Sequence, residues 1–477
     1  MINFWKKWLI CLVTLRYKNI IKFVRNLSFV LTMAKYIFSR YNILIAEGDD
    51  IAVYNTLGNS LAVLSHDEYD FLEKIVSEGV PADLEASKLD FLDRCLINNF
   101  VIPADADERE RIKEKFLSVK TGKQSLTMTI LPTLSCNFNC NYCFEGADKK
   151  SSIMNAKTQD GVMHWLESNC TELQNLNVTW FGGEPTLGMD VIRGLSRRMI
   201  DLCTKKGIAY KASIITNGSL LKSENMDAFR ECRISWIQIT LDGPKDVHDK
   251  VRFFKSDNRG SFDVIMENVR KYQSESPIAT TFRVNVDSRN EAQCYRLIDE
   301  VARELKGVKN ISMYFAPIHA STTMCKHVSA YTLEALHYAE IETKLIEYAY
   351  KNGLCNITLP PHLMGVCGAA KENGLVICPN GDIHKCWETV SVDKYKIGNI
   401  ADEKFNLRDA GKDWTSWSPF VEQECLDCRI MPNCMGMCTY RFLFKENYSG
   451  NSALTPCPSI KFDLENRLRL YLKKFHH

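Results

Sequence analysis

Three cysteines stand close together in the stretch TLSCNFNCNYCFE, which runs from Thr133 to Glu145. Cys136, Cys140 and Cys143 have the spacing C-x3-C-x2-C and follow an apolar segment with the pattern of a strand. Three thiolates can hold three irons of a [4Fe–4S] cube, which leaves the fourth iron open to another ligand. Zinc is the alternative, but it prefers four ligands and none of the neighbouring residues supplies a fourth. The spacing therefore favours a cluster with one open coordination site.

A second set of cysteines lies in the last third of the chain. The stretch CLDCRIMPNCMGMC has the spacing C-x2-C-x5-C-x3-C, with C-x13-G-x4-C before it and one more cysteine after it. The set consists of Cys367, Cys386, Cys425, Cys428, Cys434, Cys438 and Cys457. The chain has 19 cysteines, an odd number, in 477 residues, whereas disulfide scaffolds are short. The pattern therefore indicates metal ligation in a reducing, cytoplasmic compartment.

The overall composition is that of a globular protein. Hydrophobic residues make up 45% and charged residues 25% of the chain, and the formal net charge of +2 gives no indication of a nucleic-acid partner. Residues 1–40 are basic and contain no Asp or Glu, but their apolar run from Trp8 to Leu15 is too short to span a membrane. We interpret this segment either as a basic amphipathic helix on a membrane surface or as sequence upstream of a start at Met33.

Patterns of apolar and polar residues divide the rest of the chain. Residues 41–103 combine short strands with two helices, and residues 104–124 read as a charged helical linker. Strands and helices alternate over residues 125–320, which favours a parallel sheet of six β/α units, most simply a partial barrel. The α/β chain is completed by a helical bridge over residues 321–354, a cysteine-rich segment over residues 355–460 and a basic helix over residues 461–477.

Short motifs follow consecutive strands of this barrel pattern. The cysteine triplet follows the first strand, and FGGEP, with Gly182, Gly183 and Glu184, follows the second. SIITNG and LDG end the third and the fourth. Because the carboxyl ends of barrel strands meet at one edge, we expect these loops to form one site. Glycines let the backbone approach a ligand closely, and Glu184 offers a carboxylate to an ammonium group.

These motifs together resemble those of radical S-adenosylmethionine (SAM) enzymes. The triplet with its aromatic residue matches the family signature, GGEP its loop for the methionine amino group, and SIITNG its strand for the ribose and carboxylate. The resemblance implies that the open iron binds SAM and that an electron from a flavodoxin- or ferredoxin-type donor cleaves it. A 5′-deoxyadenosyl radical then removes a hydrogen atom from the substrate. The cofactor-binding residues implied are Tyr142, Gly182, Gly183, Glu184, Ser213 and Asn217.

The second set of cysteines resembles the SPASM domain, a C-terminal extension of radical SAM enzymes that act on peptides and proteins. The resemblance implies two auxiliary [4Fe–4S] clusters, and a zinc ribbon is the alternative. One cluster takes Cys425, Cys428, Cys434 and Cys457, and the other takes Cys367, Cys386 and Cys438.

The fourth ligand of the second auxiliary cluster is open at this point. Cys355, Cys378 and an iron without a protein ligand are the alternatives. The stretch LVICPNGDIHKC predicts a hairpin. If Cys378 pairs with Ile383, Cys378 and Cys386 point to opposite faces, which favours Cys355.

Two related groups compete for the function. Ribosomal-peptide maturases install thioether or carbon–carbon crosslinks in a precursor peptide, and residues 41–103 resemble their small winged-helix module, which binds the leader of that peptide. Sulfatase-maturating enzymes oxidise Cys or Ser to formylglycine, with an Asp as base directly after the cysteine that matches Cys386. Trp387 occupies that position here, which argues against the second group.

The N-terminal module has two interpretations, and so does the chain as a whole. Residues 41–103 are either a leader-binding module, with the leader added to a strand edge, or a structural cap on the barrel. The chain is either an enzyme or a redox protein that carries clusters without chemistry. The SAM-binding loops argue against a redox protein, because an electron carrier does not need them.

Overall fold

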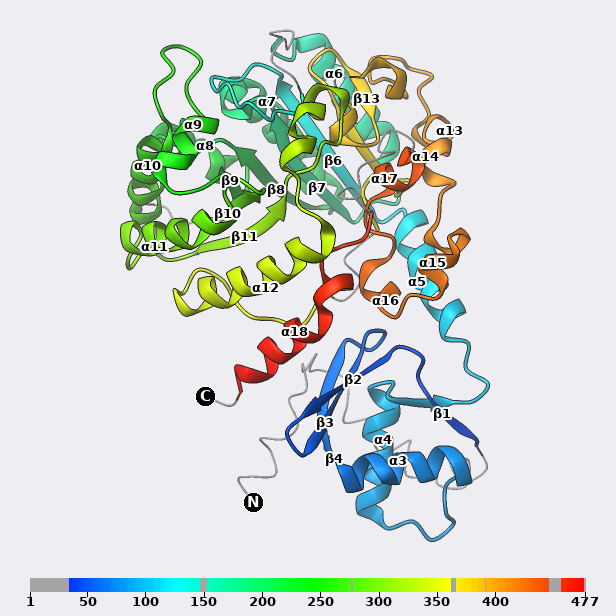
Figure 1. Ribbon diagram of the computed structural model, residues 1–477. Coiled ribbons are helices and arrows are strands. Elements are labelled where there is room, and N and C mark those ends of the chain that lie inside the picture. The colour runs from blue at the N-terminus through cyan, green and yellow to red at the C-terminus, as the bar shows by residue number, and fades with distance from the viewer. Residues whose placement is uncertain are drawn as a thin grey trace. The chain divides into compact units, whose positions relative to one another are not determined.

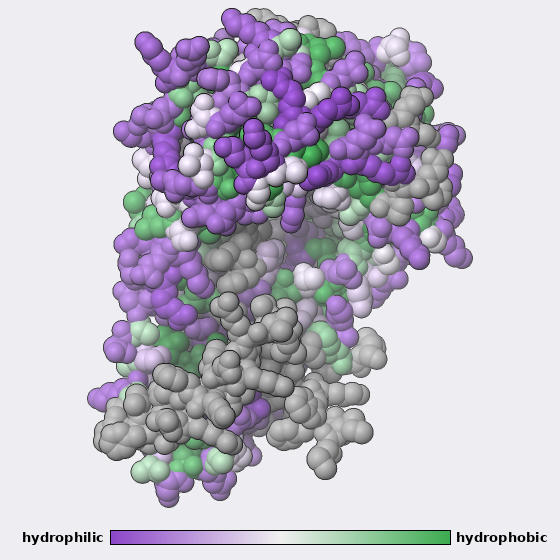
Figure 2. Space-filling view, turned by 180° about the vertical axis from the view of Figure 1, so that it is seen from behind, coloured by the Kyte–Doolittle hydropathy of each residue, from purple (hydrophilic) through white to green (hydrophobic). Residues whose placement is uncertain are grey.

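The computed structural model describes residues 34–145, 152–275, 278–361, 366–390, 392–445 and 456–475. The expectations for a basic amphipathic segment and for a start at Met33 fall mostly on residues outside these ranges. Within the described part, no helix is both long and apolar enough to cross a membrane. On the face shown in Figure 2, hydrophilic side chains predominate and hydrophobic ones appear in scattered areas.

The chain divides into two compact units (Figure 1). The first unit combines Met1–Ser118, Thr358–Gly365 and Pro419–Met437. The second combines Val119–Ile357, Val366–Ser418 and Cys438–His477. Residues 419–437 of the cysteine-rich segment therefore belong to the same unit as the N-terminal residues. The sequence predicted instead that residues 355–460 form one domain.

A nine-stranded sheet forms the centre of the second unit, in the order β11-β10-β9-β8-β7-β6-β12-β13-β14. The first six of these strands along the chain are parallel and lie in chain order, as expected for a partial barrel. Their bounds are β6 Ser125–Thr133, β7 Asn175–Gly182, β8 Ala209–Thr216, β9 Ile234–Leu241, β10 Ala279–Val286 and β11 Ile311–Pro317. The predicted fold class is confirmed.

Three strands of the cysteine-rich segment extend this sheet beyond β6. They are β12 Gly374–Ile377, β13 Asp382–His384 and β14 Gly398–Asn399. Strand β12 runs parallel to β6, with Gly374 opposite Thr127, and the other two pair antiparallel. The segment that carries Cys386 is thus built onto the edge of the barrel sheet.

Helices return the chain between the strands. They are α6 Ala156–Asn169, α7 Met189–Lys206, α8 Ser223–Glu231, α9 Lys245–Val251, α10 Phe262–Glu275 and α11 Cys294–Glu304. Helix α7 shows why they form, since Val191, Ile192, Leu195 and Met199 recur at helical spacing and are buried. It ends at Gly207, whose φ of 70° supplies the left-handed cap. The thiols of Cys170, Cys203 and Cys232 are buried in the same core.

The remainder of the second unit holds short helices and two longer ones. The short helices of three to nine residues are η2 Pro185–Gly188, η3 Glu291–Gln293, η4 Thr323–Tyr331, η5 Trp387–Thr389, η6 Asp393–Tyr395, α13 Leu407–Ala410, α14 Lys412–Thr415 and α17 Thr439–Leu443. The longer ones are α12 Ala335–Lys351 and α18 Ile460–Lys473, which pack together. An ion pair joins them, because Arg467 Nη2 lies 2.7 Å from a carboxylate oxygen of Glu342.

The first unit contains a three-stranded antiparallel sheet in the order β2-β3-β4 and a two-stranded sheet β1-β5. The N-terminal elements are β1 Tyr36–Phe38, β2 Asn42–Glu47, β3 Asp50–Asn55, β4 Ser60–Ser65, α3 His66–Glu78, α4 Ala86–Ile97, β5 Val101–Pro103 and α5 Glu108–Thr121. Gly48, with φ of 62°, makes the turn between β2 and β3. A capping box starts α3, since Glu68 N donates to Ser65 Oγ and Ser65 N donates to Glu68 Oε2.

The cysteine-rich residues Pro419–Met437 pack within the first unit, where they form η7 Pro419–Val421, α15 Gln423–Leu426 and α16 Met431–Cys434. Asn433 Nδ2 donates to the hydroxyl of Tyr54 on β3 at 3.1 Å, and Thr56 Oγ1 donates to Arg429 O at 2.6 Å. Tyr54 and Asn433 are both fully buried. These bonds hold the loop of Cys425, Cys428 and Cys434 against the N-terminal sheet.

Replacing Tyr54 with Phe is expected to weaken this attachment. The change removes a hydroxyl that contacts the buried amide of Asn433, at a cost of about 1–3 kcal/mol. We expect a lower midpoint of anaerobic thermal unfolding and less iron bound after reconstitution. Tyr69→Phe is the matched control, because this half-buried tyrosine of the same unit makes no hydroxyl hydrogen bond within the described residues. Equal behaviour of the two variants contradicts the prediction.

Candidate cluster and cofactor site

The cysteine triplet lies in the loop that follows β6, at the carboxyl end of the first barrel strand. The loop is irregular but anchored, because Asn139 N donates to Phe253 O at 3.0 Å and Lys255 N donates to Asn137 O at 2.8 Å. The rings of Phe138 and Phe254 also pack edge to face, 5.0 Å apart. The backbone between the cysteines is therefore positioned by the segment that follows α9.

The three thiols of the triplet lie within electrostatic reach of one another. Burial raises the pKa of the Cys140 thiol to about 12, Cys136 and Cys143 raise it further, and Arg252 opposes them. Among the described residues, no three His, Cys, Asp or Glu side chains are placed to bind one metal ion together. In a [4Fe–4S] cluster, by contrast, each thiolate binds a different iron. The donor set of three neighbouring thiols beside a cation fits a [4Fe–4S] cluster, whose ligands are thiolates and whose net charge is negative.

The GGE motif is joined to the start of this loop. Gly183 N donates to Thr133 O at 3.2 Å, and Glu184 N donates to Ser135 O at 2.8 Å. A Cβ atom on Gly183 would lie 2.3 Å from the carbonyl oxygens of Leu134 and Ser135. Glycine is therefore required here because the backbone at Gly183 lies against the backbone of the cysteine loop. The predicted close approach to a ligand is a second, separate reason.

The carboxylate of Glu184 is fully buried and hydrogen-bonded to the protein. Oε1 accepts from Thr216 Oγ1 at 2.7 Å and from Thr186 N at 3.1 Å, and Oε2 accepts from Asn217 N at 2.7 Å. Burial raises the pKa of Glu184, and these hydrogen bonds oppose the shift. The side chain thus joins the loop after β7 to the end of β8. Sequence reasoning missed these partners, and binding of an ammonium group by Glu184 stays a prediction.

The two residues predicted from SIITNG lie in different surroundings. Asn217 Nδ2 donates to Asn137 Oδ1 at 2.7 Å and lies 4.0 Å from Cys136 Sγ, so the structure brings Asn217 to the cysteine loop. Ser213 lies within β8, where its hydroxyl shares a hydrogen bond of 3.1 Å with Thr179 on the neighbouring strand β7. The role of Ser213 toward SAM stays a prediction.

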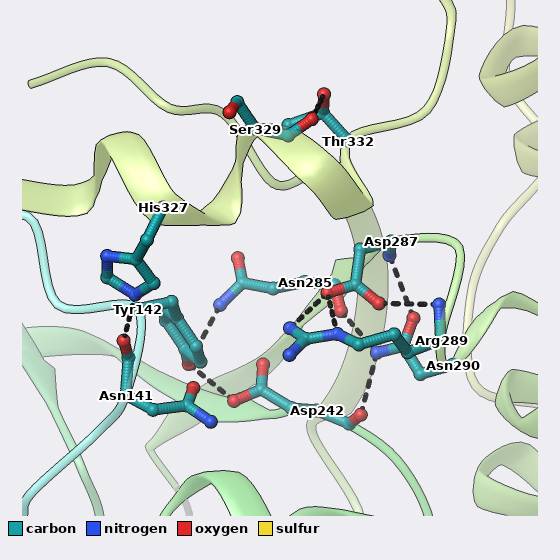
Figure 3. A network of polar contacts seen from close by, with 10 residues as sticks. All are labelled: Asn141, Tyr142, Asp242, Asn285, Asp287, Arg289, Asn290, His327, Ser329 and Thr332. Atoms are coloured by element: carbon teal, nitrogen blue, oxygen red, sulfur yellow. Dashed lines mark hydrogen bonds and ion pairs between the residues drawn. The ribbon is translucent and has the colours of Figure 1, made fainter.

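A polar network surrounds Tyr142 (Figure 3). The phenol donates to Asp242 Oδ2 and accepts from Arg252 Nη1 at 2.6 Å and from Asn285 Nδ2 at 3.2 Å. Asn290 Nδ2 in turn donates to the Asp242 carbonyl at 2.8 Å. Burial raises the pKa of both Tyr142 and Asp242, while Arg252 opposes each shift. The network fixes the ring orientation of the residue that precedes Cys143.

The sequence pointed to Tyr142 and to the LDG motif that contains Asp242, but not to Arg252 or Asn285. Arg252 follows α9 and Asn285 lies on β10, so neither stands near Tyr142 in the sequence. The signal available was the motif LDGPKDVHDKVR, which ends on Arg252.

Three further cysteines gather in the second unit. Cys367, Cys386 and Cys438 are half-buried beside the rings of Tyr395, Trp414 and Tyr440. Burial raises the pKa of Cys386, and the neighbouring Glu388, Cys367 and Cys438 add to the shift. These three cysteines thus lie near one another although their segments are far apart in the sequence, and their binding of a cluster stays a prediction. Cys425, Cys428 and Cys434 belong to the first unit and Cys457 to the second, so that four-cysteine set stays a prediction.

The predicted pairing of Cys378 with Ile383, which favoured Cys355 as the fourth ligand, is wrong. Ile377 pairs with Ile383, and Cys378 N donates to Asp382 O at 2.8 Å, so the register differs by one residue from the expected pairing. Gly381, with φ of 87°, closes a turn of three residues in place of four. The face-alternation argument that favoured Cys355 over Cys378 therefore fails.

Three aromatic rings form a row between the two cysteine regions, here called the aromatic row. Phe144 directly follows Cys143, and Trp387 directly follows Cys386. Phe181, at the end of β7, stacks on Phe144 with ring centroids 6.3 Å apart and lies 5.6 Å from the ring of Trp387. The indole of Trp387 is 42% exposed, so the row offers apolar surface beside the cysteine loop.

Gly183→Ala is expected to displace the cysteine loop. The added methyl meets two backbone carbonyl oxygens at 2.3 Å, which cannot yield as a flexible side chain would. We expect at least a tenfold loss of 5′-deoxyadenosine formation, with less iron bound. Gly194→Ala is the matched control, because the nearest atom to its Cβ is a glutamine oxygen 3.5 Å away and alanine favours the helix. Full activity of Gly183→Ala contradicts this account of the loop.

Comparisons with known proteins agree with this geometry. Residues 130–313 match the model of the radical SAM superfamily. The cysteine-type anaerobic sulfatase-maturating enzyme of Clostridium novyi (strain NT) is 26% identical over 351 residues, which covers 66% of this chain and 88% of that enzyme. The radical SAM cyclopropyl synthase TigE of Paramaledivibacter caminithermalis is 20% identical over 249 residues, 46% of this chain and 50% of TigE.

Two solved structures share the fold. Native anSMEcpe with bound AdoMet has a TM-score of 0.52 at 17% identity, with 74% of this chain and 98% of that one covered. Streptococcus suis SuiB bound to the precursor peptide SuiA has a TM-score of 0.50 at 16% identity, with 86% and 96% covered. The chain therefore carries a radical SAM domain over residues 130–313, in an enzyme related to sulfatase maturases that uses a [4Fe–4S] cluster and S-adenosylmethionine.

Proposed function

We propose that this enzyme modifies a ribosomally made precursor peptide and installs a thioether or carbon–carbon crosslink in it. Trp387 carries the proposal. It stands directly after Cys386, where the resemblance to sulfatase-maturating enzymes implies an Asp base, and an indole cannot accept a proton in that role. Its ring instead continues the aromatic row, which suits the binding of an apolar side chain of a peptide.

The residues of the loop edge have defined roles in this proposal. Cys136, Cys140 and Cys143 would hold the cluster. When bound, the cluster and SAM supply a carbon-centred radical that removes a hydrogen atom from the substrate. Glu184 keeps the loop ends together through its buried hydrogen bonds, and Arg252 neutralises charge beside the thiolates.

The first unit supports a peptide substrate with a leader. Strand β2 is an edge strand of its three-stranded sheet, and Leu44 on that strand is 49% exposed. An extended peptide can add to such an edge through backbone hydrogen bonds, with side chains such as Leu44 setting the preference. We therefore place the leader on the outer edge of β2.

Formylglycine formation is the second candidate. The similarity to the sulfatase-maturating enzyme of Clostridium novyi favours it, because that alignment covers 88% of the relative. The two candidates differ in their products. A crosslink joins two residues and adds no aldehyde group, whereas formylglycine carries one.

The first test offers the reconstituted enzyme two substrates. One is a short peptide encoded beside its gene, and the other is a peptide with the cysteine motif of a sulfatase. We expect the first peptide to lose two hydrogens by mass, to show linked fragments in tandem spectra and to remain inert to a hydrazide probe. Hydrazide labelling of the second peptide, with the first unchanged, contradicts the crosslinking proposal and establishes formylglycine formation.

The second test concerns the leader. Leu44→Arg places a charge on the exposed edge and is expected to weaken binding of a labelled leader peptide by about tenfold, roughly 1.4 kcal/mol. Ile97→Arg is the control, since Ile97 is 53% exposed on helix α4 of the same unit. Point substitutions are preferable to removing the unit, because Tyr54 and Thr56 also hold the cysteine loop. Equal leader affinity of both variants shows that the edge of β2 is not the binding surface.

A further inference from the structure

A carboxylate with one buried, unpartnered oxygen lies beside the second auxiliary set of cysteines. Glu388 belongs to the short helix η5, two residues after Cys386. Its Oε2 atom is buried and has no hydrogen-bond partner among the described residues. No ion pair within the same residues reaches Glu388 either. A buried carboxylate oxygen left in this way is costly unless a cation or donor approaches it.

Two thiols of the set lie near Glu388. Its carboxylate lies close enough to both Cys386 and Cys438 to act on them electrostatically, and Cys367 acts on the same two thiols. The backbone amides of Glu388 and Arg441 also approach the sulfurs of Cys386 and Cys438. Amide hydrogen bonds to sulfur are a normal part of the surroundings of an iron–sulfur cluster. The site therefore combines three thiols, amide donors and one unsatisfied carboxylate oxygen.

The two cysteines that the sequence offers as a fourth ligand lie elsewhere. Cys378 packs with Leu131, Val376 and Val390, and its charged neighbours are Asp382, Glu145 and Lys396. The thiol of Cys355 instead donates to the carbonyl of Ile346 on α12 at 3.3 Å. Cys367, Cys386 and Cys438 pack against a third group, around Tyr395 and Trp414. Neither candidate thiol shares the surroundings of this set.

We propose that Glu388 is the fourth protein ligand of the auxiliary cluster, with its carboxylate on the iron that Cys367, Cys386 and Cys438 leave free. An anionic oxygen is a suitable ligand for iron, and binding would satisfy the buried Oε2 atom. The ligand set of this cluster is then three thiolates and one carboxylate. This inference depends on the auxiliary-cluster assignment and is independent of which peptide or protein is the substrate.

The test examines the cluster itself and uses the full chain with Cys136, Cys140 and Cys143 all replaced by Ala. This background removes the other cluster with an open iron, whose behaviour would otherwise mask the result. Glu388→Ala, Glu388→Cys and the exposed control Glu403→Ala are each added to it and reconstituted anaerobically. The protein carries glutamate labelled with ¹³C in the side-chain carboxyl group.

The parent protein in this test is the triple-alanine background. After reduction, we expect the parent and its Glu403→Ala variant to show hyperfine coupling between a labelled ¹³C carboxyl group and a cluster. Both Glu388 variants are expected to lack this coupling. After mild oxidation, Glu388→Ala is expected to lose about one of the four irons of that cluster and give a three-iron signal. Glu388→Cys should keep all four, which also shows that the position tolerates substitution. Absence of coupling in the parent, or its persistence in Glu388→Ala, overturns the proposal. Equal iron loss in Cys355→Ala or Cys378→Ala overturns it as well.

Discussion

A single buried carboxylate holds the loop edge of the barrel together. Glu184 receives hydrogen bonds from Thr186, Thr216 and Asn217, and so joins the ends of two neighbouring strands. Asn217 then bonds Asn137 in the cysteine loop. Together with the backbone bonds of Gly183 and Glu184 to the start of the cysteine loop, these side-chain bonds hold the triplet, the glycine loop and the strand end at Asn217 in position. A charge without exposure to solvent is tolerated there because each oxygen has a protein donor.

The sequence predicted those parts of the fold and site that depend on local pattern. Alternation of strands and helices over residues 125–320 was enough for the barrel. The positions of the cysteine triplet and GGEP at strand ends follow from the same pattern. Each of these features depends on residues within one or two elements, for which spacing alone carries the information.

Features that depend on side chains from distant segments were not predictable. The contacts of Tyr142 with Arg252 and Asn285 join positions more than a hundred residues apart, and no spacing rule covers them. The hairpin register failed for another reason. The stretch PNGD allows turns of different length, and the left-handed conformation of Gly381 selects the shorter one. One residue of difference reverses a face-alternation argument, so the fourth cluster ligand was beyond sequence reasoning.

The pairing of Tyr54 with Asn433 has a consequence for biosynthesis. The two residues are separated by 379 positions in the chain, so the ribosome makes the N-terminal sheet long before the loop that packs on it. Until residues 419–437 emerge, the buried face of β3 lacks its partner, and the loop of Cys425, Cys428 and Cys434 has no surface to fold on. Contacts of such high sequence separation form slowly. Loading of the cluster predicted for this loop would therefore be a late event, and the nascent thiols would depend on a reducing environment until then.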